Sequence, residues 1–388
     1  MGRLKVFEIN LSNSAGVFYA GQVVEGHVLV ELTEPMQLRE VKLNFDGVAR
    51  VDWSETDSSN NRTSYSASEK YFTKDELLFG KTDISEGDFS ELSNGRHVWP
   101  FQFQLPFGLP CSFEGPCGYV RYIITCKINR PMKFDHKIKK IFTILSTLDL
   151  NLNPSNMKRV QDSKQKQLCC LWCKSDPISA SFHIERQGFV PGEAIKLFAE
   201  ICNGSNRKIS KSFVELRMVT TYRATTSTTL SSRVIASISR PEIPAHSEDI
   251  WSGEELIIPS VPPSFLEGCN IIDIRYFVQL NVDPAGPALD LEIPLEVVIG
   301  TIPLMSVVKQ NPPMAPVAFN DALSWPLPPP SKPGSAQIFP DLAPPSYNEC
   351  ITGRVNIKDK EDEYTRGDFV FAPAYTYYNW GHASALPE

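Results

Sequence analysis

Hydrophobic and polar residues alternate with a period of two along most of the first 300 residues. One such segment places Val41, Leu43 and Phe45 on one side of the chain and Lys42 and Asn44 on the other. The same alternation recurs in residues 101–105, 120–128, 195–201, 214–218 and 272–282. Alternating side chains point to opposite faces of a strand, and no stretch of ten or more residues shows a helical period. The pattern predicts an all-β chain built from antiparallel sandwiches.

The chain also repeats itself, which predicts two tandem sandwiches. Phe18-Tyr-Ala-Gly-Gln-Val-Val is echoed by Phe189-Val-Pro-Gly-Glu-Ala-Ile. A proline-rich turn with a Ser-Phe pair leads into Val120-Arg-Tyr, and a similar turn leads into Ile274-Arg-Tyr. Matched order and matched residue pairs favour duplication over recurring turn chemistry. We expect the two sandwiches over residues 1–149 and 177–301.

Composition changes between and after the two copies. Residues 130–174 hold ten Lys or Arg against three Asp, and residues 150–176 show little strand pattern, so they are expected to form a basic, cysteine-containing linker. Residues 302–388 hold fourteen of the 31 prolines. Such a segment cannot bury enough apolar surface to fold alone, so we expect a disordered tail.

Several classes of protein are disfavoured by composition. A net charge of -7 over 388 residues argues against a nucleic-acid partner. No apolar run reaches the ~18 residues of a membrane-spanning helix, and the first residues lack an apolar signal core. Nine cysteines, an odd number in a long chain, do not suggest a disulfide scaffold. The expected location is the cytoplasm.

A Pro-Pro-x-Tyr motif in the tail is the strongest functional signal. It comprises Pro344, Pro345 and Tyr347, with Ser346 between them. Adjacent prolines preset an extended left-handed helix that docks in an aromatic groove at low entropic cost. The tyrosine then fills a neighbouring pocket, as in peptides bound by WW domains. An accessible, proline-rich setting favours this interpretation over a chance match.

A second, degenerate motif lies further along the tail. Pro373 and Tyr375 match the end of the pattern, but Ala372 stands where the first proline would be. One interpretation is a weaker second contact that adds avidity with a partner carrying several WW domains. The other is an aromatic chain end, with Tyr377, Tyr378 and Trp380, that has no ligand role.

Three cysteines in the linker form the sequence Cys169-Cys170-Leu-Trp-Cys173. A zinc site needs four ligands, and no second cysteine pair stands at a suitable spacing. Flanking lysines suggest palmitoylation or contact with an anionic membrane leaflet. Ordinary linker cysteines are the alternative.

No catalytic constellation is recognisable. The six histidines show no metal-ligand spacing, and neither a phosphate-binding loop nor a nucleophile elbow is present. We expect a binding protein with no catalytic residues, metal or cofactor.

The chain resembles the α-arrestins, the arrestin domain-containing proteins, over nearly its whole length. The resemblance rests on the motifs Leu105-Pro, Ser112-Phe-Glu-Gly, Val120-Arg-Tyr, Cys169-Cys-Leu-Trp-Cys, Ile184-Glu-Arg-Gln-Gly-Phe-Val-Pro-Gly-Glu, Gly268-Cys-Asn-Ile-Ile, and the two tail motifs. The resemblance implies two arrestin sandwiches and a tail that recruits HECT-class ubiquitin ligases through their WW domains. It also implies that the sandwiches engage receptors or transporters at the plasma membrane and endosomes, and so direct ubiquitination, endocytosis and sorting.

Two alternatives remain. The family includes the thioredoxin-interacting protein, whose redox partnership uses a cysteine shortly before a Trp-x-Gly. Here residues 245–253 end in Trp251-Ser-Gly253 and contain no cysteine, so a thioredoxin partner is not expected. The second alternative is a trafficking scaffold that works without a ligase, like the arrestin-fold subunit of retromer.

Overall fold

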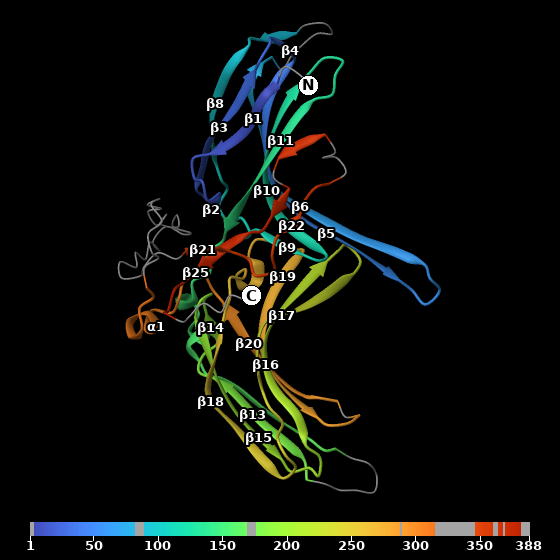
Figure 1. The fold of residues 1–388 in the computed structure, drawn as a ribbon, viewed down its shortest axis with the longest axis vertical. Coiled ribbons are helices and arrows are strands. Elements are labelled where there is room, and N and C mark those ends of the chain that lie inside the picture. The colour runs from blue at the N-terminus through green and yellow to red at the C-terminus, as the bar shows by residue number, and fades with distance from the viewer. Residues whose placement is uncertain are drawn as a thin grey trace.

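Two β-sandwich domains lie end to end, and the last described part of the chain lies where they meet (Figure 1). The structure is a computed structural model that describes residues 4–81, 89–168, 176–287, 289–314, 346–359, 364–367 and 369–381. The predicted all-β tandem architecture is confirmed. Within the described residues the one α-helix is α1 (Met305–Gln310).

The N-terminal domain packs one sheet against another. The first sheet has the order β1 (Leu4–Leu11), β3 (Val23–Leu32), β8 (Gly95–Gln104). The second has the order β2 (Val17–Tyr19), β11 (His136–Leu145), β10 (Gly118–Asn129), β5 (Glu40–Thr56), β6 (Arg62–Gly80), with β9 (Phe113–Gly115) beside β10. A small pair, β4 (Met36–Leu38) and β7 (Ser90–Leu92), lies outside them. As predicted, Val41, Leu43 and Phe45 are fully buried.

The C-terminal domain has the same plan. One sheet has the order β12 (Val160–Lys166), β13 (Ile178–Ile184), β15 (Ala194–Asn203), β18 (Ser247–Ile257). The other has the order β14 (Gly188–Phe189), β20 (Leu291–Ile299), β19 (Ile272–Pro284), β16 (Ile209–Arg223), β17 (Thr228–Arg240). Three short 3-10 helices complete the two domains: η1 (Leu150–Leu152), η2 (Pro154–Met157) and η3 (Ser264–Leu266).

Matched hydrogen bonds support the duplication that the sequence predicts. The Tyr122 hydroxyl donates to the Pro110 carbonyl at 2.7 Å, and the Tyr276 hydroxyl donates to the Pro262 carbonyl at 2.8 Å. Likewise Ser112 and Ser264 each accept, through Oγ, a bond from a backbone amide of a later strand, at 2.9 Å in both domains. A buried polar group needs such a partner, so the same residues recur where the same turn is buried.

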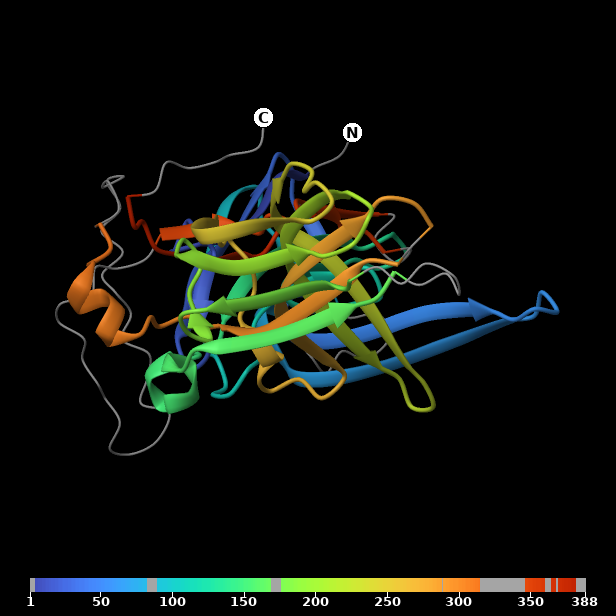
Figure 2. The same cartoon turned by 90° about the horizontal axis from the view of Figure 1, so that it is seen from below.

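One hairpin extends well beyond the N-terminal domain. It is formed by β5 and β6, and it projects sideways in both views (Figures 1 and 2). Near its outer end the rings of Trp53 and Tyr65 lie 5.5 Å apart across the two strands. Such a cross-strand aromatic pair stabilises a two-stranded arm that lacks a second covering sheet.

Part of the segment expected to be a linker, residues 150–176, forms a regular strand. Val160–Lys166 form the edge strand β12, whose side chains are mostly exposed on both faces. Because neither face is buried, the strand carries no hydrophobic alternation for a sequence pattern to reveal. Residues 169–175 lie outside the described residues.

Within the tail expected over residues 302–388, the described parts contain regular structure. They contain α1 and five short strands: β21 (Ser346–Glu349), β22 (Val355–Asn356), β23 (Thr365–Gly367), β24 (Val370–Phe371) and β25 (Ala374–Tyr377). Strand β21 pairs with β25, β22 with β24, and β23 lies parallel to β11. Segments this short cannot fold alone, but they bury their apolar side chains against the two domains.

The matched tyrosines give a test of the duplicated core. Tyr122→Phe and Tyr276→Phe should each lower the free energy of unfolding by about 1–3 kcal/mol, because each leaves a buried carbonyl without its donor. Urea denaturation measures the change, with Tyr65→Phe on the outer arm as a control that should have a smaller effect. A negligible cost for either buried variant would contradict the proposed equivalence.

Candidate functional site

The tail motifs lie in one structural unit that crosses the junction of the two domains. We name residues 346–350 and 373–380 the strap. Within it β21 and β25 are antiparallel, with Tyr347 opposite Thr376 and Asn348 opposite Tyr375. We name the buried junction beneath it the seam, where the apolar side chains of both domains form one continuous cluster. The strap therefore brings together Tyr347 and Tyr375, the tyrosines of the two motifs, which are 28 residues apart in sequence.

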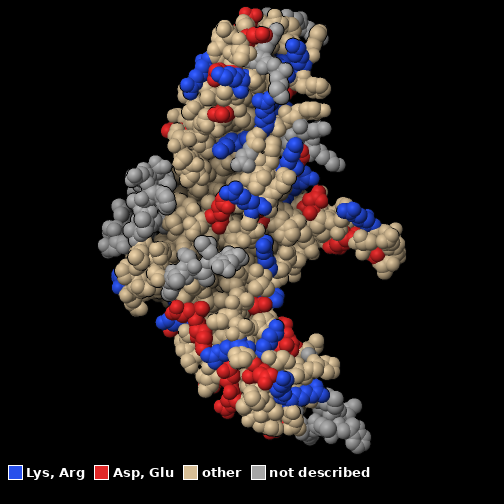
Figure 3. Space-filling view, in the orientation of Figure 1, with Lys and Arg blue, Asp and Glu red and all other residues tan. Residues whose placement is uncertain are grey.

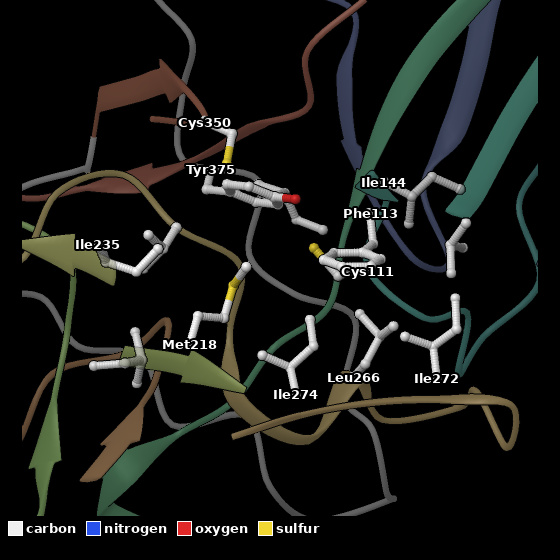
Figure 4. Close-up of a cluster of buried hydrophobic side chains, with 14 of the residues drawn as sticks. Cys111, Phe113, Ile144, Met218, Ile235, Leu266, Ile272, Ile274, Cys350 and Tyr375 are labelled. Atoms are coloured by element: carbon white, nitrogen blue, oxygen red, sulfur yellow. The ribbon is translucent and has the colours of Figure 1, made fainter. Parts of the chain in front are cut away.

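Tyr375 anchors the strap on the N-terminal domain. Its side chain is only 2% exposed, and its hydroxyl donates to the Ser112 carbonyl at 3.0 Å. In Figure 4 the ring lies beside Cys350, and it faces the seam where Cys111 and Phe113 of one domain and Met218 of the other are drawn. Burial raises the pKa of Tyr375 well above its usual value, so the hydroxyl remains a neutral donor.

Backbone groups of the strap are held by both domains. The Ala374 amide donates to Thr143 Oγ1 of β11 at 3.3 Å, and Ser260 Oγ of the C-terminal domain donates to the Asn348 carbonyl at 2.8 Å. The Ile351 amide, just beyond β21, donates to the Ser260 carbonyl at 3.0 Å. These bonds satisfy polar backbone that would otherwise be buried without partners.

The C-terminal end of the strap forms a second anchor. The Tyr378 hydroxyl donates to the Thr301 carbonyl at 2.8 Å, and the Tyr378 amide donates to the Pro191 carbonyl at 3.1 Å. Tyr378 and Trp380 belong to a small buried cluster with Leu150, Val190, Val298, Leu304 and Val308. A side chain at Gly192 would collide with the Tyr378 carbonyl, because a Cβ there would lie 1.9 Å from that oxygen. The strap therefore requires glycine at this position.

Tyr347, the tyrosine of the intact motif, is only half-buried. It packs against the continuous apolar cluster, and its hydroxyl lies close to that of Tyr19 in the N-terminal domain. Burial raises the pKa of Tyr347, and its interaction with the Tyr19 hydroxyl partly offsets that rise. A ligand that takes the tyrosine side chain into a pocket can reach Tyr347 only after this contact with Tyr19 opens. Pro344 and Pro345 lie outside the described residues.

The degenerate motif is placed differently. The Pro373 carbonyl accepts the Cys350 amide at 2.9 Å, and Tyr375 lies in the seam as described above. The sequence allows a second interpretation of this region, an aromatic chain end without a ligand role. In the structure these aromatic residues pack on the two domains. Neither Pro373 nor Tyr375 is available to a ligand while the strap is in place.

The thiols in the described part of the chain show no sign of activation. Burial raises the pKa of Cys111 to about 12 and also raises that of Cys350. Cys202 lies opposite Glu248, across from the stretch where a redox cysteine was sought, and burial and this carboxylate raise its pKa as well. A reactive cysteine needs the opposite shift. Cys169, Cys170 and Cys173 lie outside the described residues.

Two kinds of feature are absent from the described ranges. No helix among them is long and apolar enough to cross a lipid bilayer. Likewise, no group of three His, Cys, Asp or Glu side chains is placed there to hold a metal ion.

Sequence reasoning missed the residues that receive the strap. Tyr19, Ser112, Thr143, Ser260 and Gly192 come from separate turns and strands of both domains. Tyr19, Ser112 and Gly192 lie in motifs that the sequence analysis singled out, but nothing in those motifs indicated that they contact the tail.

Comparisons with known proteins agree with this architecture. The family described as arrestin (or S-antigen), N-terminal domain, matches residues 7–151, and the corresponding C-terminal domain family matches residues 174–304. Human arrestin domain-containing protein 4 is 32% identical over 376 residues, covering 94% of this chain and 84% of the relative. Arrestin domain-containing protein 17 of Caenorhabditis elegans is 29% identical, covering 97% and 100%. Human arrestin domain-containing protein 1 is 29% identical, covering 89% and 72%.

The chain therefore belongs to the arrestin domain-containing proteins, the α-arrestins.

Replacing the seam tyrosine tests how much it contributes. Tyr375→Ala should lower the free energy of unfolding by about 3–5 kcal/mol, because it leaves a cavity in a close-packed core. Tyr375→Phe should cost about 1–3 kcal/mol, because it leaves the buried Ser112 carbonyl without this donor. Urea denaturation of the full chain measures both, with Tyr377→Ala, a half-buried position in the same strand, as the matched control. Equal effects of Tyr375→Ala and Tyr377→Ala would show that the seam does not depend on Tyr375.

Proposed function

We propose that this α-arrestin is a non-enzymatic adaptor that brings HECT-class ubiquitin ligases to membrane cargo. The ligase would bind through its WW domains to Pro344, Pro345 and Tyr347. The cargo would be a receptor or transporter held by the two sandwiches, and binding would promote its ubiquitination, endocytosis and endosomal sorting. The protein would then be cytoplasmic and recruited to the plasma membrane and endosomes.

The observation that carries the proposal is the intact Pro-Pro-Ser-Tyr motif, whose tyrosine lies in the strap. A preset extended helix followed by tyrosine supplies what a WW groove recognises. Because Tyr347 contacts Tyr19 and β21 pairs with β25, the motif is competent only in the fraction of molecules whose strap has opened. The apparent dissociation constant then equals the intrinsic constant divided by that fraction.

Because binding depends on the open fraction, replacing Tyr347 and replacing Tyr375 should change the affinity for a WW domain in opposite directions. Tyr347→Ala should weaken binding of a HECT-ligase WW tandem by at least about tenfold, because it removes the anchor side chain. Tyr375→Ala should instead tighten binding by about threefold or more, because it raises the open fraction. Surface-immobilised full-length chain and a soluble WW tandem give both constants, with Tyr377→Ala as control.

The other outcomes are equally informative. Weaker binding by Tyr375→Ala would make residues 373–375 a second ligand, as the degenerate motif suggested. Equal binding by wild type and Tyr347→Ala, or no binding by either, would contradict ligase recruitment and favour a ligase-independent scaffold.

A further inference from the structure

The turn between β10 and β11 exposes an unusual group of apolar side chains. Met132 is fully exposed, Phe134 is 76% exposed, and Tyr364 of the tail is 67% exposed. The rings of Phe134 and Tyr364 stack at 5.3 Å. Single exposed apolar residues are common on protein surfaces, but adjacent ones mark contact sites. We name residues 130–135 together with Tyr364 the distal tip.

The distal tip is held in shape by polar contacts. The Arg130 amide donates to Asp135 Oδ1 at 3.2 Å, and Arg130 Nε donates to the Phe134 carbonyl at 2.9 Å. Met132 has a φ of 50°, a left-handed conformation that bulky side chains rarely adopt. Strand β23 extends the sheet beside β11, pairing Arg366 with Ile138. The apolar side chains are thus fixed outward on a rigid hairpin rather than on a loose loop.

Positive charge surrounds the distal tip, although the chain as a whole is acidic. Residues 127–140 contain six Lys or Arg and one acid, Asp135. On the outer face of the sheet an open hollow of about 370 Å³ is lined by Lys42, Lys127, Lys137 and Lys139, with Glu40 and Asp75 at its side. Lys127 pairs with Asp135 at 2.8 Å, and Lys42 pairs with Asp75 at 2.7 Å. The lysines outnumber the carboxylates around the hollow, so an anionic group is favoured there.

The position of the distal tip leaves the strap unobstructed. Figure 1 shows the β10–β11 turn at the far end of the N-terminal domain, away from the seam. Figure 3 shows basic side chains with scattered acidic ones over this N-terminal half, and acidic and basic side chains mixed in the C-terminal half. A surface that engages the distal tip could therefore be occupied together with the tail motif.

We propose that the distal tip docks on an anionic membrane leaflet. Met132, Phe134 and Tyr364 would enter the headgroup region, where aromatic side chains are favoured at the boundary between water and hydrocarbon. The lysines of the hollow would contact lipid phosphates, as basic clusters do beside anionic lipids. An acidic chain with one basic, apolar end would then approach the membrane in a single orientation. This proposal does not depend on ligase recruitment.

Vesicle flotation of the full-length chain tests the proposal. Wild type should float with phosphatidylcholine–phosphatidylserine vesicles, float much less with pure phosphatidylcholine, and be released as salt rises. The double variant Met132→Ala/Phe134→Ala should lower the bound fraction with anionic vesicles by at least about fivefold, because it removes the inserting side chains. Lys133→Gln/Lys137→Gln should lower it as well, and should reduce its dependence on salt.

Matched variants at other exposed positions serve as controls. Leu289→Ala and Lys208→Gln, both in the C-terminal domain and both exposed, should float as wild type does. Unchanged urea midpoints confirm that the tip variants fold.

Three results would overturn the proposal. They are no flotation of wild type with anionic vesicles, equal flotation of the Met132/Phe134 variant, and equal flotation with neutral vesicles. Light scattering can give a fourth contradicting result. If wild type is a dimer and the Met132/Phe134 variant is a monomer, the distal tip is an interface between copies of this chain.

Discussion

The burial of Tyr375 between the two sandwiches is the contact on which the arrangement of the tail depends. Strand β25 has four residues and its partner β21 has four, and a two-stranded pair of this length is not stable in water by itself. The strap becomes ordered because the Tyr375 ring leaves water in the seam and its hydroxyl finds the Ser112 carbonyl. Tertiary burial, rather than local propensity, accounts for the strands in the tail.

The strap also breaks the symmetry that duplication produced. Each domain buries an equivalent tyrosine and an equivalent serine, so the two halves begin as copies. The tail then crosses both domains. The Tyr375 hydroxyl donates to a carbonyl of the first domain, and the Tyr378 hydroxyl donates to the Thr301 carbonyl at the end of the second. Because Tyr347 belongs to the same strand pair, exposure of the motif and closure of the seam are coupled through linked equilibria.

Much of the fold follows from the sequence, for a clear physical reason. Strands such as β5 have one buried and one exposed face, and that asymmetry is written directly in the alternation of Val41, Leu43 and Phe45. Edge strand β12 has no buried face, so its sequence shows no hydrophobic alternation that would predict a strand. The strap was hidden for a different reason, because its burial depends on residues more than 200 positions away, such as Ser112 and Thr143. The proline content of the tail is a local property of the sequence. It cannot predict that the folded domains bury the strap.

Hydrogen exchange of the full chain, with and without a saturating WW-domain protein, tests the central claim most directly. The claim is that Tyr347, the proposed ligase-binding tyrosine, and the seam belong to one coupled unit. Slow exchange of the Ala374 and Tyr378 amides in the free chain, and faster exchange once the WW domain is bound, is the predicted result. Tyr347→Ala should retain slow exchange with the WW domain present. Unchanged exchange at these amides while the WW domain occupies Tyr347 would contradict the claim.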